Sequence, residues 1–436
     1  MLSSATIKLN FKRMKINGLR WWIIGLIGLV TVINYTDRST LAIMWPSISS
    51  DLGMNTKDYA LILNVFMVAY AIGQSVSGRL FDKIGTRIGY VFAIGLWGVS
   101  SFMHSFARGI FSFAFLRATL GLGEAGNWPG AVKSNAEWFP VKERAIAQGI
   151  FNSGASIGSV IAAPLIATLW AAFGWKVTFM IVGSFAILWL IPWLIIYKAL
   201  PEKHSWITEL EKEYILSGRS KEEKDGTKSL SIKELLSHRE AWAVLIGRFF
   251  TDPIWWLFVG WMPLYLANVY GFNVKQIGYF AWVPYVGAAI GSIVGGAYAG
   301  KLIHKGKSVN YARKKTITIA GVVMFLGLAA TIFYANTPLK FVIIVAFVLF
   351  GFQFGISNLQ TIPSDLFTGK SVGTLAGLGG TFGVLSVIVI NFMVPYITAA
   401  YSYTPIFVLI AIFVPLGVLA VYILAPQIKL VDIESN

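Results

Sequence analysis

The chain consists of long apolar segments separated by short polar connections. A transmembrane helix needs about 20 consecutive, mostly apolar residues, and twelve segments of the sequence meet this requirement. They cover residues 21–44, 59–80, 88–107, 110–136, 145–171, 176–197, 241–268, 276–300, 315–335, 339–364, 372–398 and 403–425. The pattern predicts an all-α membrane protein with twelve transmembrane helices.

A polar stretch from Lys198 to Glu240 divides these segments six and six. Its charged run, Lys221–Asp225, is typical of a solvated linker. The sequence Glu137-Trp138-Phe139 recurs loosely as Asp365-Leu366-Phe367, each time before a glycine-rich segment. Two related six-helix halves around a central site are a known transporter plan. We therefore expect two pseudo-symmetric six-helix bundles, over residues 1–197 and 241–436, joined by a cytoplasmic linker over 198–240.

Composition supports a lipid environment. The chain is 56% hydrophobic and 13% charged, and its mean hydropathy is +0.68, whereas soluble proteins carry about 25% charged residues. It has no cysteine, which excludes thiol catalysis and thiolate metal sites. The four histidines have no metal-ligand spacing. We expect no cofactor other than a coupling ion.

The net charge of +16 could suggest a nucleic-acid partner. However, the basic residues lie in the connections between apolar segments rather than in one patch. Alternate connections are rich in Lys and Arg, while the intervening ones carry one each: Lys57, Arg108, Lys176, Lys275 and Lys340. Basic connections stay in the cytoplasm, so we expect both termini to be cytoplasmic and no nucleic acid to bind.

A sequence motif follows the second apolar segment. Residues 78–87, Gly-Arg-Leu-Phe-Asp-Lys-Ile-Gly-Thr-Arg, resemble the loop signature of the major facilitator superfamily. The resemblance implies a cytoplasmic gate that includes Gly78, Asp82 and Arg87. Glycine permits close backbone approach, and Asp82 could pair with basic groups or a helix N-terminus. The corresponding stretch of the second half, residues 295–305, lacks the aspartate, so that latch is degenerate or absent.

Three further motifs, Asn34–Arg38, Arg117 with Gly123–Gly130, and Glu137–Arg144, resemble those of the anion:cation symporter family. Within that family, Gly123–Gly130, Phe151–Gly154 and Ile254–Trp256 look most like bacterial hexuronate transporters. By the same resemblance, Glu137 and Arg144 extend the cytoplasmic gate. We expect a monomer that crosses the bacterial inner membrane many times, with the lipid bilayer and a small organic anion as its partners.

Four ionisable residues inside the segments are the candidate chemical groups. Each costs at least about 2.5–3.5 kcal/mol at the bilayer centre, so each needs a partner or a function. Asp37 and Arg38 are adjacent, about 100° apart on a helix, and should pair with other helices. Arg117 and Glu124 are two turns apart on one face, about 10 Å along the axis. A purely structural buried network is the alternative.

The resemblance gives these residues roles. Asp37 and Glu124 would carry protons, Arg38 would bind the substrate carboxylate, and Arg117 would couple the acids to conformational change. Arginine stays charged and has a planar fork that suits a carboxylate. A buried carboxylate can take up a proton near neutral pH. The expected coupling ion is therefore a proton.

Polar and aromatic residues at the expected midplane are the candidates for sugar recognition. The resemblance implies Tyr35 and Tyr70. Depth and polarity add Gln74, Asn152, Trp255, Trp256, Gln353 and Asn358, although the two tryptophans could equally serve packing and the two amides on 339–364 could simply be hydrogen-bonded. Residues 377–390 offer only Thr381 and Ser386. Arg248 and Asp252 have the i,i+4 spacing of an intrahelical bridge, for which we expect a structural or gating role.

The sequence thus predicts a proton-coupled symporter that imports a sugar-acid anion by alternating access, a hexuronate such as galacturonate or glucuronate. An aldonate, aldarate or other organic anion is the alternative substrate, and export by the same machinery is open. An enzyme is disfavoured because no nucleophile or metal cluster is found. A channel would not need the buried acids, and a membrane sensor would normally carry a soluble signalling domain.

Overall fold

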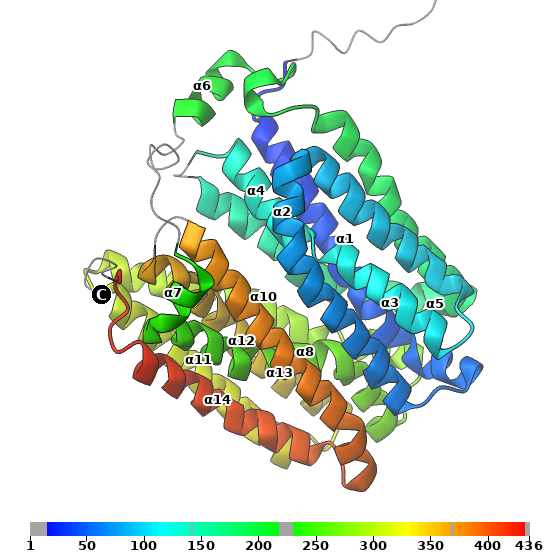
Figure 1. The fold of residues 1–436 in the computed structure, drawn as a ribbon. Coiled ribbons are helices and arrows are strands. Elements are labelled where there is room, and N and C mark those ends of the chain that lie inside the picture. Colours follow the sequence, from blue (N-terminus) through cyan, green and yellow to red (C-terminus); the bar gives the residue numbers. More distant parts are fainter. Residues whose placement is uncertain (1–14, 141–142, 218–229, 368–369, 432–436) are drawn as a thin grey trace, which may run out of the picture.

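The computed structural model describes residues 15–140, 143–217, 230–367 and 370–431. Within these ranges the chain is almost entirely helical, apart from loops and one isolated bridge between Ile16 and Ile207. The helices, shown in Figure 1, are α1 (Leu19–Leu52), α2 (Thr56–Met103), α3 (Ile110–Glu124), α4 (Asn127–Trp138), α5 (Arg144–Ile196), α6 (Glu209–Ser217), α7 (Ile232–Ser237), α8 (Arg239–Tyr270), α9 (Val274–Phe280), α10 (Val283–His304), α11 (Val309–Tyr334), α12 (Pro338–Leu366), α13 (Lys370–Ala400) and α14 (Thr404–Leu424).

Two glycines turn the chain inside the longest helices. Gly85 in α2 has φ 79° and Gly174 in α5 has φ 73°, a left-handed conformation that favours glycine. Each therefore separates two membrane-length segments. Among the described residues, nine helices are long and apolar enough to cross a membrane, and one of them, Ala147–Ile196, counts 50 residues. At about 1.5 Å per residue that stretch is more than twice the thickness of the hydrocarbon core, enough for two crossings.

The elements match the predicted segments once these turns are counted. α2 and α5 each supply two segments, α3 with α4 one, and α9 with α10 one. The remaining segments are the single helices α1, α8, α11, α12, α13 and α14. The all-α, twelve-helix prediction is confirmed.

The helices form two groups. In Figure 1, α1–α5 lie together on one side and α8–α14 on the other; these are called here the N-terminal and C-terminal groups. Small residues let helices approach closely where lipid gives no hydrophobic drive. A Cβ on Gly158 of α5 would lie 2.5 Å from the carbonyl oxygen of Val32 in α1. A Cβ on Gly291 of α10 would lie 2.2 Å from the carbonyl oxygen of Phe350 in α12.

The connection between the groups is partly folded onto the bundle. Glu211 of α6 is buried and accepts hydrogen bonds from the backbone N–H groups of Gly18 and Leu19, at 2.9 and 3.0 Å. It also pairs with Arg20, whose Nη1 lies 2.8 Å from its Oε1. A carboxylate at this position stabilises the start of α1. The run Lys221–Asp225, predicted to be a solvated linker, lies outside the described residues.

Side chains of the two groups form hydrogen bonds with each other at the end of the bundle far from α6. That end is called here the opposite end, and the α6 end the linker end. Asn391 of α13 donates to Asn64 of α2, with Nδ2 3.1 Å from Oδ1, and accepts from Trp261 Nε1 of α8 at 2.9 Å. Nearby, the Tyr59 hydroxyl donates to the carbonyl oxygen of Gly260. Asn64, Asn391 and Trp261 form what is called here the amide bridge.

Candidate functional site

Arg38 of α1 and Glu124 of α3 form a buried ion pair. Arg38 Nε lies 2.5 Å from Glu124 Oε2, and the two side chains are 3% and 0% exposed. Among the described residues, the other ends of both groups have no hydrogen-bond partner: Arg38 Nη2 and Glu124 Oε1 are buried and unpaired. Leaving such groups unpaired is costly, so this is where an additional anion or proton would be stabilised.

Four aromatic rings surround the Arg38 guanidinium. Its central carbon lies 4.6 Å from the ring centroid of Tyr70 and 5.3 Å from that of Tyr35. Phe66 lies at 5.7 Å and Trp256 at 5.4 Å. Rings at these distances stabilise a cation while excluding water. Trp256 lies on α8, so the cation is shared between the N-terminal and C-terminal groups.

Asp37 and Arg117 complete a cluster with this pair. Asp37 is fully buried and accepts a hydrogen bond from Ser101 Oγ at 2.7 Å, while its Oδ2 has no hydrogen-bond partner in the part of the chain that the structure describes. Arg117 is buried, and no described residue hydrogen-bonds to its Nε or Nη2; it interacts electrostatically with Asp37 and Glu124. The structure thus brings together Asp37, Arg38, Arg117 and Glu124, called here the charge cluster. As predicted, Arg38 and Asp37 pair with other helices rather than with each other.

Three sugar-recognition candidates lie at or beside Arg38, and a fourth is near. Tyr35, Tyr70 and Trp256 contact the guanidinium directly. Gln74 lies on α2 one turn from Tyr70, about 6 Å along the axis. Asn152 on α5 is half-buried and accepts a weak bond from Gln148, with the two atoms 3.5 Å apart.

Of the other candidates, Trp255 and Asn358 have local partners. Trp255 is buried and stacks on Phe352, with ring centroids 5.5 Å apart, a packing role. Asn358 accepts from Arg313 Nη1 at 3.0 Å, and Arg313 also pairs with Asp365 at 2.9 Å. Asn358 therefore belongs to a cluster inside the C-terminal group. Gln353, on α12, is half-buried.

The predicted gate residues lie on α2, α4 and α5. Glu137 accepts hydrogen bonds from Thr86 Oγ1 at 2.9 Å and from the Tyr197 hydroxyl. Arg87 donates to the carbonyl oxygen of Leu194 at 3.2 Å. Both sets of contacts stay inside the N-terminal group, and a Cβ on Gly78 would meet open space. The side chains of two further gate residues, Asp82 and Arg144, lie outside the described residues.

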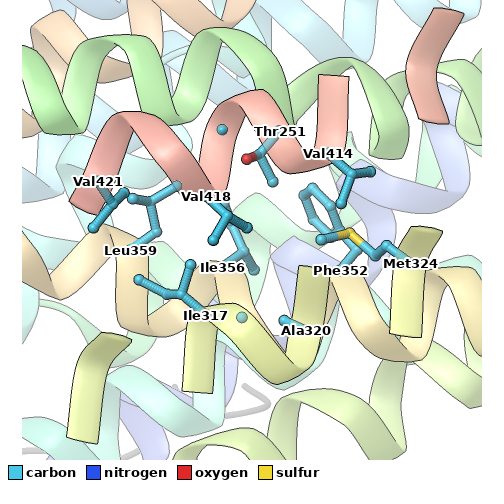
Figure 2. A pocket seen from close by; sticks show the side chains of 12 residues that line it. Thr251, Ile317, Ala320, Met324, Phe352, Ile356, Leu359, Val414, Val418 and Val421 are labelled. Atoms are coloured by element: carbon cyan, nitrogen blue, oxygen red, sulfur yellow. The ribbon is translucent and has the colours of Figure 1, made fainter. Parts of the chain in front are cut away.

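A pocket in the C-terminal group is mainly apolar. It lies between α8, α11, α12 and α14 and is lined by aliphatic and aromatic side chains, with the Thr251 hydroxyl among them (Figure 2). The described residues that line it include no charged side chain. Among the described residues there is also no group of three His, Asp or Glu side chains that could hold a metal ion.

Several residues of the site and of the amide bridge are not predicted by the sequence. Ser101, the partner of Asp37, and Phe66, beside Arg38, carry no motif. Asn391 lies one residue beyond the stretch 377–390, and Asn64 belongs to no motif. A polar side chain inside an apolar segment was the available signal for Ser101, Asn64 and Asn391.

A multi-pass helical protein that buries a charge cluster in one group of helices, where a ring of the other group contacts it, has the architecture of a membrane transporter. The model of the Major Facilitator Superfamily matches residues 27–391. The chain is 34% identical over 411 residues to the Hexuronate transporter of Escherichia coli (strain K12), covering 94% of each chain. It is 36% identical over 313 residues to the Galacturonate transporter of Dickeya chrysanthemi, covering 71% of this chain and 90% of that one.

The fold agrees. A bacterial homolog of the human lysosomal transporter Spinster, solved in an inward-facing and unoccupied conformation, superposes with a TM-score of 0.68 at 15% identity, covering 94% of this chain and 96% of that one. The chain belongs to the Major Facilitator Superfamily. It is a transporter and not an enzyme, as the sequence predicts.

Proposed function

We propose that the protein is a proton-coupled symporter that imports a hexuronate. The observation that carries the proposal is the Arg38–Glu124 pair, 2.5 Å long, with Arg38 Nη2 buried and unpaired. A guanidinium held by one edge offers the other edge to a carboxylate. The relatives named for hexuronate and galacturonate transport support the choice of a sugar acid that carries one carboxylate.

Protonation of Glu124 would couple the two ligands. Removing one partner of a buried ion pair leaves the other charge uncompensated, at a cost of about 3–5 kcal/mol. When Glu124 takes up a proton, Arg38 therefore needs a new anion, and the substrate carboxylate supplies it. By linkage, the bound anion in turn favours the protonated carrier. Asp37 is the second proton site, and Arg117, which interacts electrostatically with both acids, transmits their charge state.

The loaded cluster lies where the two groups meet, because Trp256 of α8 stacks on Arg38 of α1. Neutralising the cluster lowers the cost of moving it between two orientations of the groups, which is the requirement of alternating access. The excess of Lys and Arg in the connections of the linker end supports a cytoplasmic position for both termini. The proposed setting is the bacterial inner membrane, with the protein as a monomer and the proton as coupling ion.

Uptake of labelled galacturonate into proteoliposomes, driven by an inward proton gradient, tests the proposal. Wild-type protein should accumulate the sugar acid, and unlabelled glucuronate should compete. Glu124→Gln should lose accumulation but keep exchange of internal for external substrate, because a permanently neutral side chain binds the anion without responding to the gradient. Wild-type accumulation by Glu124→Gln would overturn the coupling role. Competition by aldonates or aldarates alone would overturn the hexuronate assignment.

A further inference from the structure

Arg248 of α8 is held by its neighbour but keeps one donor free. Its Nε and Nη2 lie 3.1 and 2.7 Å from the same oxygen, Oδ2, of Asp252. Among the described residues, Nη1 has no hydrogen-bond partner, and the side chain is 18% exposed while that of Asp252 is 6% exposed. An intrahelical bridge of purely structural use does not need this third nitrogen, which is therefore available to a ligand.

Nη1 lies beside Gly380 of α13, where the C-terminal group borders α2 of the N-terminal group. A Cβ on Gly380 would lie 3.4 Å from Arg248 Nη1 and 3.6 Å from Gln74 Oε1. Arg248 and Gln74 therefore border the same small space, one from each group of helices. Gln74 also has no side-chain hydrogen bond within the described part of the chain. Gly383, one turn along α13, leaves room for the Arg248–Asp252 bridge, because a Cβ at this position would clash with Asp252 Oδ2.

The register of the helices relates this space to Arg38. Trp256, which stacks on Arg38, is eight residues from Arg248 on α8, about 12 Å along the axis. Tyr70, which also stacks on Arg38, is four residues from Gln74 on α2, about 6 Å along the axis. Both steps run toward the linker end, so Gln74 and Arg248 follow Arg38 in that direction. A six-carbon acid with a hydrogen bond of about 3 Å at each end can reach from Arg38 to this space.

We propose that Arg248 and Gln74 bind the distal, hydroxyl-bearing end of the sugar acid whose carboxylate is bound by Arg38. Asp252 is the positioning residue: it occupies two nitrogens of the fork and turns the third toward the substrate. The inference rests on the proposed function, because it assumes a sugar acid at Arg38. It gives the C-terminal group a direct contact with the substrate, and it supplies the distal recognition for which residues 377–390 have only Thr381 and Ser386.

Equilibrium binding to the purified full chain tests this contact. The ligands are galacturonate and its analogue without the hydroxyl on the carbon farthest from the carboxylate, and the proteins are wild type and Arg248→Gln. Losing a hydrogen bond to a charged group costs about 1.5–3 kcal/mol, so Arg248→Gln should weaken galacturonate binding at least about tenfold. The deoxy analogue should bind wild type as weakly as galacturonate binds the variant, and should lose little further affinity in the variant.

Non-additivity of this cycle supports the contact. Equal weakening of both ligands by Arg248→Gln, or no weakening, overturns it. Arg248→Lys keeps the charge and the Asp252 pair, and repeats the cycle if Arg248→Gln does not fold. Arg313→Gln is the matched control, because it breaks another Arg–Asp pair of the C-terminal group and should weaken both ligands alike or not at all. If wild type binds a different sugar acid instead of galacturonate, the hexuronate assignment fails, and the cycle is run with that acid and its own distal deoxy analogue.

Discussion

At the scale of single residues, the site depends on which partners contact each nitrogen and each face of the Arg38 guanidinium. Arg38 gives Nε to Glu124, presents its faces to the rings of Tyr70 and Trp256, and leaves Nη2 unpaired. A planar fork can do all of this at once. A lysine ammonium is a compact point charge on a flexible stem and cannot hold one carboxylate at one edge and a second at another.

Arg38→Lys should therefore be severely defective although it conserves charge. Loss of a buried, charge-assisted hydrogen bond costs about 1.5–3 kcal/mol, so galacturonate uptake at low substrate concentration should fall at least about tenfold. Initial rates in proteoliposomes measure this, and Arg108→Lys, at an exposed position in a connection, is the control. Wild-type rates in Arg38→Lys would show that charge alone suffices.

At the scale of elements, the connection after α5 is anchored by a neutral histidine. His204 Nδ1 accepts the backbone N–H of Trp206 at 3.1 Å, and its Nε2 donates to the carbonyl oxygen of Ile196 at 2.9 Å. Since the N–H of Trp206 can only donate, Nδ1 must be unprotonated. Burial lowers the pKa of His204 below its usual 6.5, and the nearby Lys198 lowers it further.

The anchor should weaken in acid. Because the folded pKa of His204 is below that of the undocked chain, the undocked chain binds the proton more tightly, and docking loses stability as the pH falls below about 6.5. Hydrogen exchange over residues 198–217 should accordingly become faster between pH 7.5 and 5.5, after correction for the intrinsic rate. His204→Gln, which cannot titrate, should remove this dependence. An unchanged slope in His204→Gln would assign the effect to other groups.

At the scale of the whole molecule, the amide bridge holds the two groups together at the opposite end. Asn391 is its centre, since it bonds to Asn64 of the N-terminal group and to Trp261 of its own group. Close to it, Lys57 Nζ lies 5.0 Å from the ring centroid of Tyr396, another contact between the groups. Because the chain has no native cysteine, engineered thiols can report on this interface without background.

Removing the bridge should open this end more often. In a Lys57→Cys/Tyr396→Cys pair, a bifunctional methanethiosulfonate reagent, which spans the gap left by the two shortened side chains, should cross-link the two groups quickly and stop transport, and reduction should restore it. Adding Asn391→Ala leaves Asn64 and Trp261 without their partner, at a cost of about 1–3 kcal/mol, and should slow cross-linking several-fold. Asn310→Ala, which removes an acceptor for the backbone of Ile428, is the control. Equal rates in all three proteins would mean that the amide bridge does not hold the interface.

Prediction from sequence succeeded where the signal was local. Membrane-length segments follow from apolar run length, and even the turns inside α2 and α5 fall between predicted segments, at Gly85 and Gly174. The charge cluster was found because an ionisable side chain inside an apolar helix is conspicuous. Ser101 and Phe66 were missed because a serine or a phenylalanine in a span is ordinary until its neighbours are known.

The sequence by itself determined the membrane class, the number of spans and the charges that need partners, because each follows from residue type and helix period along one segment. Only the tertiary structure decided the partners: Glu124 for Arg38, Ser101 for Asp37, and Arg313 rather than the Arg38 site for Asn358. It also placed the free nitrogen of Arg248 beside Gln74. These choices depend on the rotation and depth at which helices from distant parts of the chain pack, and no local pattern specifies those.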